Sequence, residues 1–232
     1  MSELFKQIKW QFLIFQRNNL ITMIFGITVF YMVVLYFLKD AGNVEKLTTL
    51  LIFNDPALIG FIFTGLAVIL EKDQEVFSAL FVTPINQHVY LISRIVTLST
   101  ISMICALGMV FVARGTMFRP LHFSLGVFSG CVIFSFVGVF VVSFTTEILH
   151  FMLRSIPIVV LMSLPFLNYF GVTDLSIFKF FPVQGSLFLI DNSYSNSPDL
   201  SELVFGYLSL AIWIPLLYWF VFKTFRSRAI NT

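Results

Sequence analysis

Charged side chains are scarce in this sequence: Asp, Glu, Lys and Arg together make up 11% of its 232 residues. An average soluble domain carries about 25%. Hydrophobic residues reach 58%, thirty residues are Phe, and the mean hydropathy is +0.94. Such a chain cannot cover itself with a surface compatible with water, so the sequence predicts an integral membrane protein. The net charge of +2 is small and no basic run occurs, which argues against a nucleic-acid partner.

Metal-binding and disulfide patterns are missing. The two cysteines, Cys105 and Cys131, fall in apolar stretches without a CxxC or Cys/His spacing, so we expect them to pack in the core. The motif HExxH is absent, and the three histidines, His88, His122 and His150, lie near the ends of predicted spans. We therefore expect no metal and no other cofactor in this chain.

Nucleotide-binding and hydrolase motifs are also lacking. A P-loop closes with Gly-Lys-Ser/Thr, and none of the twelve glycines is followed by lysine. The string GVFSG at residues 126–130 places its serine fourth, so the GxSxG pattern of a serine nucleophile fails. We expect a non-catalytic chain. If it works on a substrate, the energy must come from another protein or from an ion.

Ion coupling requires ionisable side chains at membrane depth, where a charge costs about 2.5–3.5 kcal/mol or more. The predicted spans carry none in their middles: Arg94 lies near the inner end of the third, and Asp55 at the outer edge of the second. The sequence therefore argues against proton or sodium coupling.

Six apolar segments are long enough to cross a bilayer, which needs about 20 residues of helix. The fold class is therefore an all-α integral membrane protein, with residues 1–232 forming one transmembrane domain. In the second segment, Asn54-Asp55-Pro56 predicts a helix start, with a capping pair and proline in the first turn. The predicted spans are approximately Leu20–Leu38, Pro56–Leu70, Val89–Val112, Phe123–Thr145, Ser155–Val172 and Leu203–Phe222.

The distribution of Lys and Arg predicts the orientation. An even number of spans puts both termini on one side, and that side carries nine basic residues against five on the other. We therefore expect both termini in the cytoplasm. The nine are Lys6, Lys9, Arg17, Lys72, Arg94, Arg154, Lys223, Arg226 and Arg228.

Two further segments are apolar without spanning. Residues 1–18 place Leu4, Phe5, Ile8, Phe12 and Phe15 on one helical face, which predicts an interfacial helix that ends at Asn18-Asn19. The alternative is an inward extension of the first span, and no small-residue cleavage pattern marks a signal peptide. In the outer loop, residues 173–202, the run from 178 to 190 is broken by Pro182 and Gly185 and predicts a re-entrant or interfacial piece.

The fourth span carries glycines four residues apart. Gly126 and Gly130 form a GxxxG pattern, which permits two helices to approach closely. We expect these glycines to serve packing within the chain.

The cytoplasmic segment 71–87 interrupts the apolar chain with EKDQEVFSALFVTPINQ. This segment resembles the corresponding segment of the ABC-2 type transporter permease family. The likeness lies in its acids, its short apolar run and its Thr-Pro stop, followed by Tyr90-Leu91 and Arg94. Within this family, the chain looks most like the drug-export permeases annotated for fluoroquinolone efflux, and FNDPALIGFIFTGLAVILEKD and FPVQGSLFLID add to the likeness.

The resemblance implies that this segment is a coupling helix that docks on a separate ATP-hydrolysing subunit. The residue pattern agrees, because an amphipathic helix binds a groove through a few apolar anchors with polar residues at the rim. The acids would stand at the start of that helix, where the helix dipole favours negative charge, and Pro84 would end it. The alternative is a solvated loop. The ATPase-coupling residues are Glu71, Asp73, Glu75, Val76, Phe77, Leu80, Phe81, Thr83 and Pro84.

The resemblance also implies a substrate path along the second and fifth spans, at the interface between two permease copies. A wall rich in Phe and Met suits an amphiphilic or aromatic substrate. Pro157 and Pro165 would bend the fifth span. The candidate lining residues are Phe63, Thr64, Met162, Phe166 and Asn168.

The expected assembly is a homodimer of permeases in the bacterial plasma membrane, in contact with lipid and with two copies of an ABC ATPase that bind ATP and Mg. Its task would be outward transport of a hydrophobic or drug-like molecule. Export of lipid, peptide or haem-related substrates by the same fold remains an alternative, as does a non-transporting scaffold or membrane enzyme.

Overall fold

The structure is a computed structural model that describes residues 2–38, 44–73, 87–195 and 198–229. These residues form helices joined by short turns, and no strand occurs among them. Six helices are long and apolar enough to cross a membrane, which confirms the predicted number and the all-α class. They are Leu20–Leu38, Thr48–Asp73, Gln87–Arg114, Pro120–Val142, Ile148–Tyr169 and Leu200–Ser227.

Several of these spans consist of more than one element. The second joins α3, a short π-helix η1 and α4, and the fifth joins α8 and α9. The elements in chain order are α1 (Ser2–Arg17), α2 (Leu20–Leu38), α3 (Val44–Leu58), η1 (Ile59–Phe63), α4 (Thr64–Asp73), α6 (Gln87–Arg114), α7 (Pro120–Val142), α8 (Ile148–Ser163), α9 (Pro165–Tyr169), the 3₁₀-helix η2 (Ser176–Phe180), α10 (Gln184–Tyr194) and α11 (Leu200–Ala229).

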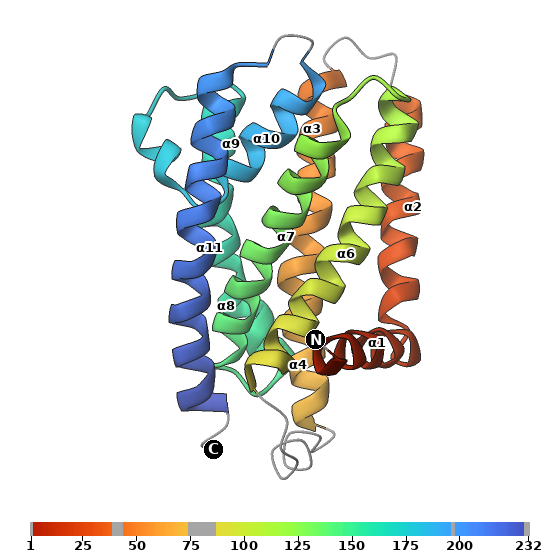
Figure 1. The fold of residues 1–232 in the computed structure, drawn as a ribbon, viewed down its shortest axis with the longest axis vertical. Coiled ribbons are helices and arrows are strands. Elements are labelled where there is room, and N and C mark those ends of the chain that lie inside the picture. Colours follow the sequence, from red (N-terminus) through yellow and green to blue (C-terminus); the bar gives the residue numbers. More distant parts are fainter. Residues whose placement is uncertain (1, 39–43, 74–86, 196–197, 230–232) are drawn as a thin grey trace.

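The spans stand side by side, and the two termini lie at the same end of the bundle (Figure 1). The last turn of α4 and the first turn of α6, which flank residues 74–86, lie at that end too. This is the arrangement that an even number of spans requires.

Helix α1 lies across this end of the bundle, nearly perpendicular to the spans (Figure 1). It packs against α6 and α2 through the buried side chains of Gln11 and Phe15, while Phe5 and Trp10 are exposed. The turn into α2 falls at Asn18-Asn19, where Asn19 has a φ of 57°, a conformation that asparagine tolerates. The predicted helix and its end are confirmed, and its exposed aromatic side chains suit a position at a membrane surface.

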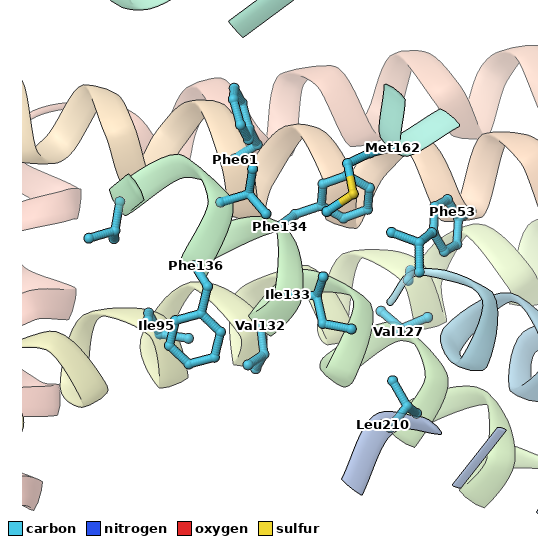
Figure 2. Close-up of a cluster of buried hydrophobic side chains, with 14 of the residues drawn as sticks. Phe53, Phe61, Ile95, Val127, Val132, Ile133, Phe134, Phe136, Met162 and Leu210 are labelled. Carbon is cyan, nitrogen blue, oxygen red and sulfur yellow. The ribbon is translucent and has the colours of Figure 1, made fainter. Parts of the chain in front are cut away.

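Helix α7 is the centre of the bundle. It packs against α3, η1, α4, α6, α8, α10 and α11, and its side chains supply much of the buried cluster in Figure 2. Glycines allow this packing: Gly126 and Gly130 face α10, where the Ser186 hydroxyl donates to the Gly126 carbonyl at 2.6 Å. The predicted role of these two glycines in packing within the chain is confirmed.

The closest approach joins η1 to α7. A Cβ atom added to Gly60 would lie 2.5 Å from the carbonyl oxygen of Cys131. We expect Gly60→Ala to destabilise the fold by about 1–3 kcal/mol, because the clash is with backbone that cannot move aside. Gly26 on α2 is the matched control, since no atom lies within 4 Å of an added Cβ there. Thermal unfolding in lipid nanodiscs should show Gly26→Ala at or above the wild type and Gly60→Ala well below it. Equal midpoints would contradict the close packing.

The second span departs from the prediction at its outer end. The helix begins at Val44 rather than at Pro56, and Pro56 lies inside α3. The expected cap at Asn54-Asp55 is therefore wrong, and Asp55 lies fully buried within the span instead of at its edge. Residues 45–49, EKLTT, are mostly polar, and the predicted span therefore did not include them. In the structure, Thr48 and Thr49 are nevertheless buried.

The segment before the last span also becomes part of the core. Residues 176–180 form η2, and α10 follows, packed against α7 and α11 with Leu187, Leu189 and Ile190 buried. In the fifth span, the helix continues through Pro157 and is divided at Leu164, directly before Pro165. One of the two predicted proline positions thus interrupts the span.

Candidate functional sites: an apolar groove and a buried ion pair

Two adjacent hollows run along the side of the bundle between the second span and α8. One has a volume of about 410 Å³ and the other about 360 Å³, and both are lined by Val159 of α8. We call the two together the α3–α8 groove. Its residues are Leu50, Phe53, Asn54, Ala57, Phe61 and Ile62 of the second span, Phe134 of α7, Phe151, Met152, Ser155, Ile156, Val159, Val160, Met162 and Ser163 of α8, and Phe166 of α9.

Aromatic rings form the walls of this groove. Phe53 meets Phe166 edge to face with the ring centroids 5.0 Å apart, and it meets Phe134 in the same way at 5.8 Å. Phe61 and Phe151 stack at 5.7 Å. Figure 2 shows Phe53, Phe134 and Met162 gathered from α3, α7 and α8. A groove of this kind binds flat apolar groups through shape and dispersion.

A few polar groups accompany the rings. Asn54 lines the larger hollow, and its side-chain amide donates to the Tyr31 hydroxyl at 2.9 Å. The side-chain oxygen of Asn54 can accept a hydrogen bond from a ligand. Ser163 lies in the same hollow and Ser155 in the other, although each hydroxyl donates to a backbone carbonyl of its own helix. The groove therefore combines a mostly apolar lining with a small number of orienting groups, as ligand sites commonly do.

The predicted lining residues divide into two sets. Met162 and Phe166 lie in the groove. Phe63 points instead into a separate buried cluster with Phe15 and Leu20, and the Thr64 hydroxyl lies 3.2 Å from that of Ser135 on α7. Asn168 holds the following loop, where its amide donates to the Leu175 carbonyl at 3.2 Å.

The π-helix moves Thr64 away from the groove. Residues 50, 54, 57 and 61 follow the spacing of one helical face, which would bring residue 64 to the groove in an unbroken α-helix. The i to i+5 hydrogen bonding of η1 adds a residue to the turn between 59 and 63 and moves Thr64 off that face. Phe63 and Thr64 were predicted from the family resemblance, which carries no signal for this π-helical turn.

A buried ion pair joins the end of α4 to the start of α6. The Arg94 guanidinium pairs with the Glu71 carboxylate, and both side chains are almost completely buried. The Tyr90 hydroxyl donates to the second oxygen of Glu71, and the Arg94 guanidinium lies 4.8 Å from the centre of the Tyr90 ring. Helical spacing brings Tyr90 and Arg94 together, because residues four apart share a face.

A second basic residue attaches α4 to α7. The Lys72 ammonium donates to the carbonyls of Val142 and Thr145, each at 3.3 Å. These carbonyls lie at the C-terminal end of α7, where positive charge is favoured. Arg154 of α8 donates to the neighbouring carbonyl of Phe144. The ends of α4, α6, α7 and α8 are thus tied together at the end of the bundle that carries the termini.

The predicted ATPase-coupling residues are only partly described. Glu71 and Asp73 belong to the last turn of α4, so their predicted position at the start of a separate helix is wrong. Glu71 is turned inward to Arg94, whereas Asp73 is exposed. The remaining predicted coupling residues, Glu75, Val76, Phe77, Leu80, Phe81, Thr83 and Pro84, lie outside the described residues, and their role stays a prediction.

Comparison with known proteins assigns the chain to a family. The sequence model of the fluoroquinolones export permease protein family matches residues 2–232. Among curated relatives, two proteins named fluoroquinolones export permease protein, from Mycobacterium tuberculosis strains CDC 1551 / Oshkosh and ATCC 25618 / H37Rv, are each 26% identical over 142 residues. Each alignment covers 61% of this chain and 60% of the relative, so the chain spans about three fifths of their length. The resemblance drawn from the sequence is confirmed at the level of the family.

Proposed function

Because the chain belongs to the fluoroquinolones export permease protein family, we propose that it is the membrane subunit of an ABC-2 type exporter for flat, amphiphilic, drug-like molecules. The observation that carries this proposal is the α3–α8 groove, whose aromatic walls and few polar groups match such a substrate in chemistry and in size. The relatives' printed names support a fluoroquinolone as the first substrate to test.

Energy in the proposed exporter comes from ATP hydrolysed by a separate ABC ATPase. The sequence supports this division of labour, because it holds no P-loop motif. The Glu71–Arg94 pair supports a place for the coupling: it joins the two helix ends that flank residues 74–86. A displacement of that segment by a partner would act on both spans together instead of bending one of them.

The proposed assembly contains two copies of the chain and two of the ATPase in a bacterial plasma membrane. Both termini and the flanks of residues 74–86 lie at one end of the bundle, and that end carries the excess of Lys and Arg. By the positive-inside rule, this end faces the cytoplasm, where an ATPase is accessible.

The function is tested with inside-out vesicles that contain the chain and the ATPase that co-purifies with it. We expect ATP-dependent uptake of a fluoroquinolone, and no uptake with a non-hydrolysable ATP analogue. Uptake that persists without ATP, or copies of the chain that never retain an ATPase, would reject the proposal. A preference for lipid or peptide substrates over the fluoroquinolone would assign the same fold to the alternative task.

The double substitution Phe77→Asp/Phe81→Asp tests the docking segment. If these phenyl groups anchor in the ATPase, burying two carboxylates in their place should weaken co-purification by about tenfold or more, since an anchor residue commonly contributes over 1.4 kcal/mol. Gln74→Asp/Asn86→Asp is the matched control, because it adds the same charges to the same segment at polar positions. Equal retention of the ATPase by both variants would contradict docking through the phenylalanines.

A further inference from the structure

An acidic side chain lies inside the second span without a hydrogen-bonding partner. Asp55 is on α3, eight residues into the stretch Thr48–Asp73, and its side chain is fully buried. Neither of its carboxylate oxygens has a hydrogen-bond partner among the described residues. The sequence had placed this residue at the edge of the span, and on that ground it argued against ion coupling. Because Asp55 lies inside the span, the absence of an ionisable side chain at membrane depth no longer argues against ion coupling.

One hydroxyl and two thiol groups lie near the carboxylate. Thr28 of α2 lies beside Asp55, but its hydroxyl donates to the Ile24 carbonyl at 3.0 Å. The Cys131 thiol of α7 neighbours the Ser99 and Ser102 hydroxyls of α6. Asp55, Thr28, Cys105 and Cys131 thus form a buried polar cluster, which we call the Asp55 pocket.

The described helices around this pocket bring no basic side chain to Asp55. The titratable groups that face it are the thiols of Cys105 on α6 and Cys131 on α7, while α2 contributes the Thr28 hydroxyl. Helix α10 also packs against α3, and none of its ionisable side chains faces Asp55. A carboxylate that is buried at membrane depth without a cation beside it is strongly disfavoured, whereas a protonated carboxyl is tolerated.

We propose that Asp55, buried in this pocket, is a proton-binding site within the membrane. The proton is bound in this conformation and is released when the outer part of the second span turns. This inference goes beyond the proposed function, because it adds a second ligand to the cycle and does not depend on the ATPase or on the drug.

The backbone next to Asp55 provides a place for that turn. Pro56 follows directly and supplies no N–H to the carbonyl one turn before it, and η1 begins three residues later. Such π-helical turns often mark functional sites, and a change of one residue in their register rotates the adjoining helix by about 100°. Asn54, the neighbour of Asp55, already lines the α3–α8 groove. A rotation of the outer part of the second span by one residue would therefore move the Asp55 carboxyl from the core to the α3–α8 groove.

Labelling with dicyclohexylcarbodiimide tests the site, because this reagent reacts with protonated carboxyls in apolar surroundings. The full chain in lipid nanodiscs is treated over a range of pH at constant ionic strength, and the modified residues are identified by mass spectrometry. We expect about tenfold more modification at Asp55 than at the exposed Asp73, since only the buried acid is held neutral. The modification should fall as the pH rises and should not change when sodium replaces potassium.

The Asp55→Asn variant supplies the matched control. It resembles the neutral acid in shape, so we expect an unchanged melting temperature together with loss of the label at this position. Infrared difference spectra between low and high pH should show a carboxylic acid band that disappears with rising pH in the wild type and is missing from the variant. Protection by sodium would assign the pocket to a metal cation and overturn the proposal. Absence of both the label and the band would overturn it as well.

Discussion

The Glu71→Leu substitution is expected to destabilise the protein by about 3–5 kcal/mol, because it leaves the guanidinium of Arg94 buried without its counter-charge. Arg94→Leu should cost a similar amount, since among the described residues the Glu71 carboxylate then keeps only the hydrogen bond from the Tyr90 hydroxyl. The double variant, Glu71→Leu/Arg94→Leu, should be more stable than either single variant, because two leucines in contact need no counter-charge. Unfolding in lipid nanodiscs, monitored by thermal scans of all three variants, measures this coupling.

Asp73→Asn is the control for this series. Asp73 lies two residues after Glu71 on the same helix but is exposed, so its neutralisation should change stability by no more than about 0.5 kcal/mol. If Glu71→Leu is as mild as Asp73→Asn, the buried pair does not hold α4 to α6.

The double variant Glu71→Leu/Arg94→Leu also distinguishes a role of the pair in stability from a role in transmitting movement from the ATPase to the spans. Where the pair transmits movement from residues 74–86 to both spans, a folded double variant that retains the ATPase should hydrolyse ATP yet export little. Where the pair serves folding alone, the double variant should export at the rate of the wild type. The same protein preparation thus decides between a coupling role and a purely structural one.

Much of the architecture follows from features that act over short distances along the chain. The number of spans follows from stretches of apolar residues, and the end of α1 follows from Asn18-Asn19, where the apolar face stops and a turn is easily formed. The glycine spacing in α7 predicted close packing, because the absence of a side chain has a direct steric meaning.

The features that sequence reasoning missed depend on partners distant in the chain. Asp55 and Glu71 are both buried acids. Glu71 pairs with Arg94, which lies 23 residues later in the chain, whereas no described basic group faces Asp55. These partners become visible only in the folded chain. The polar start of α3 was missed for the same reason, since Thr48 and Thr49 are buried by neighbouring helices. A π-helical turn has no dependable sequence signal, so the displacement of Thr64 from the face that lines the groove could not be predicted.

Filling the groove is the substitution with the largest expected effect on transport. Val159 lines both hollows, so the indole of Val159→Trp would occupy the space where they meet. If the groove is the path of the proposed exporter, export of the fluoroquinolone should fall by about tenfold or more, since a loss of 1.4 kcal/mol in binding already gives that factor. Val159 is exposed and belongs to neither buried hydrophobic cluster, so the variant should fold and retain the proposed ATPase partner.

Leu161→Trp is the matched control, because Leu161 is an exposed residue of the same helix that lines neither hollow. Drug accumulation in cells and ATP-driven uptake in vesicles should both separate the two variants. If Val159→Trp reduces export only of larger substrates, the groove is the path and its width sets the size limit. If the two tryptophans have equal effects, the substrate travels elsewhere and the groove is filled by lipid. Because ATP hydrolysis and assembly are measured on the same samples, a loss of export at Val159 reports on the path itself and not on the coupling through Glu71 and Arg94.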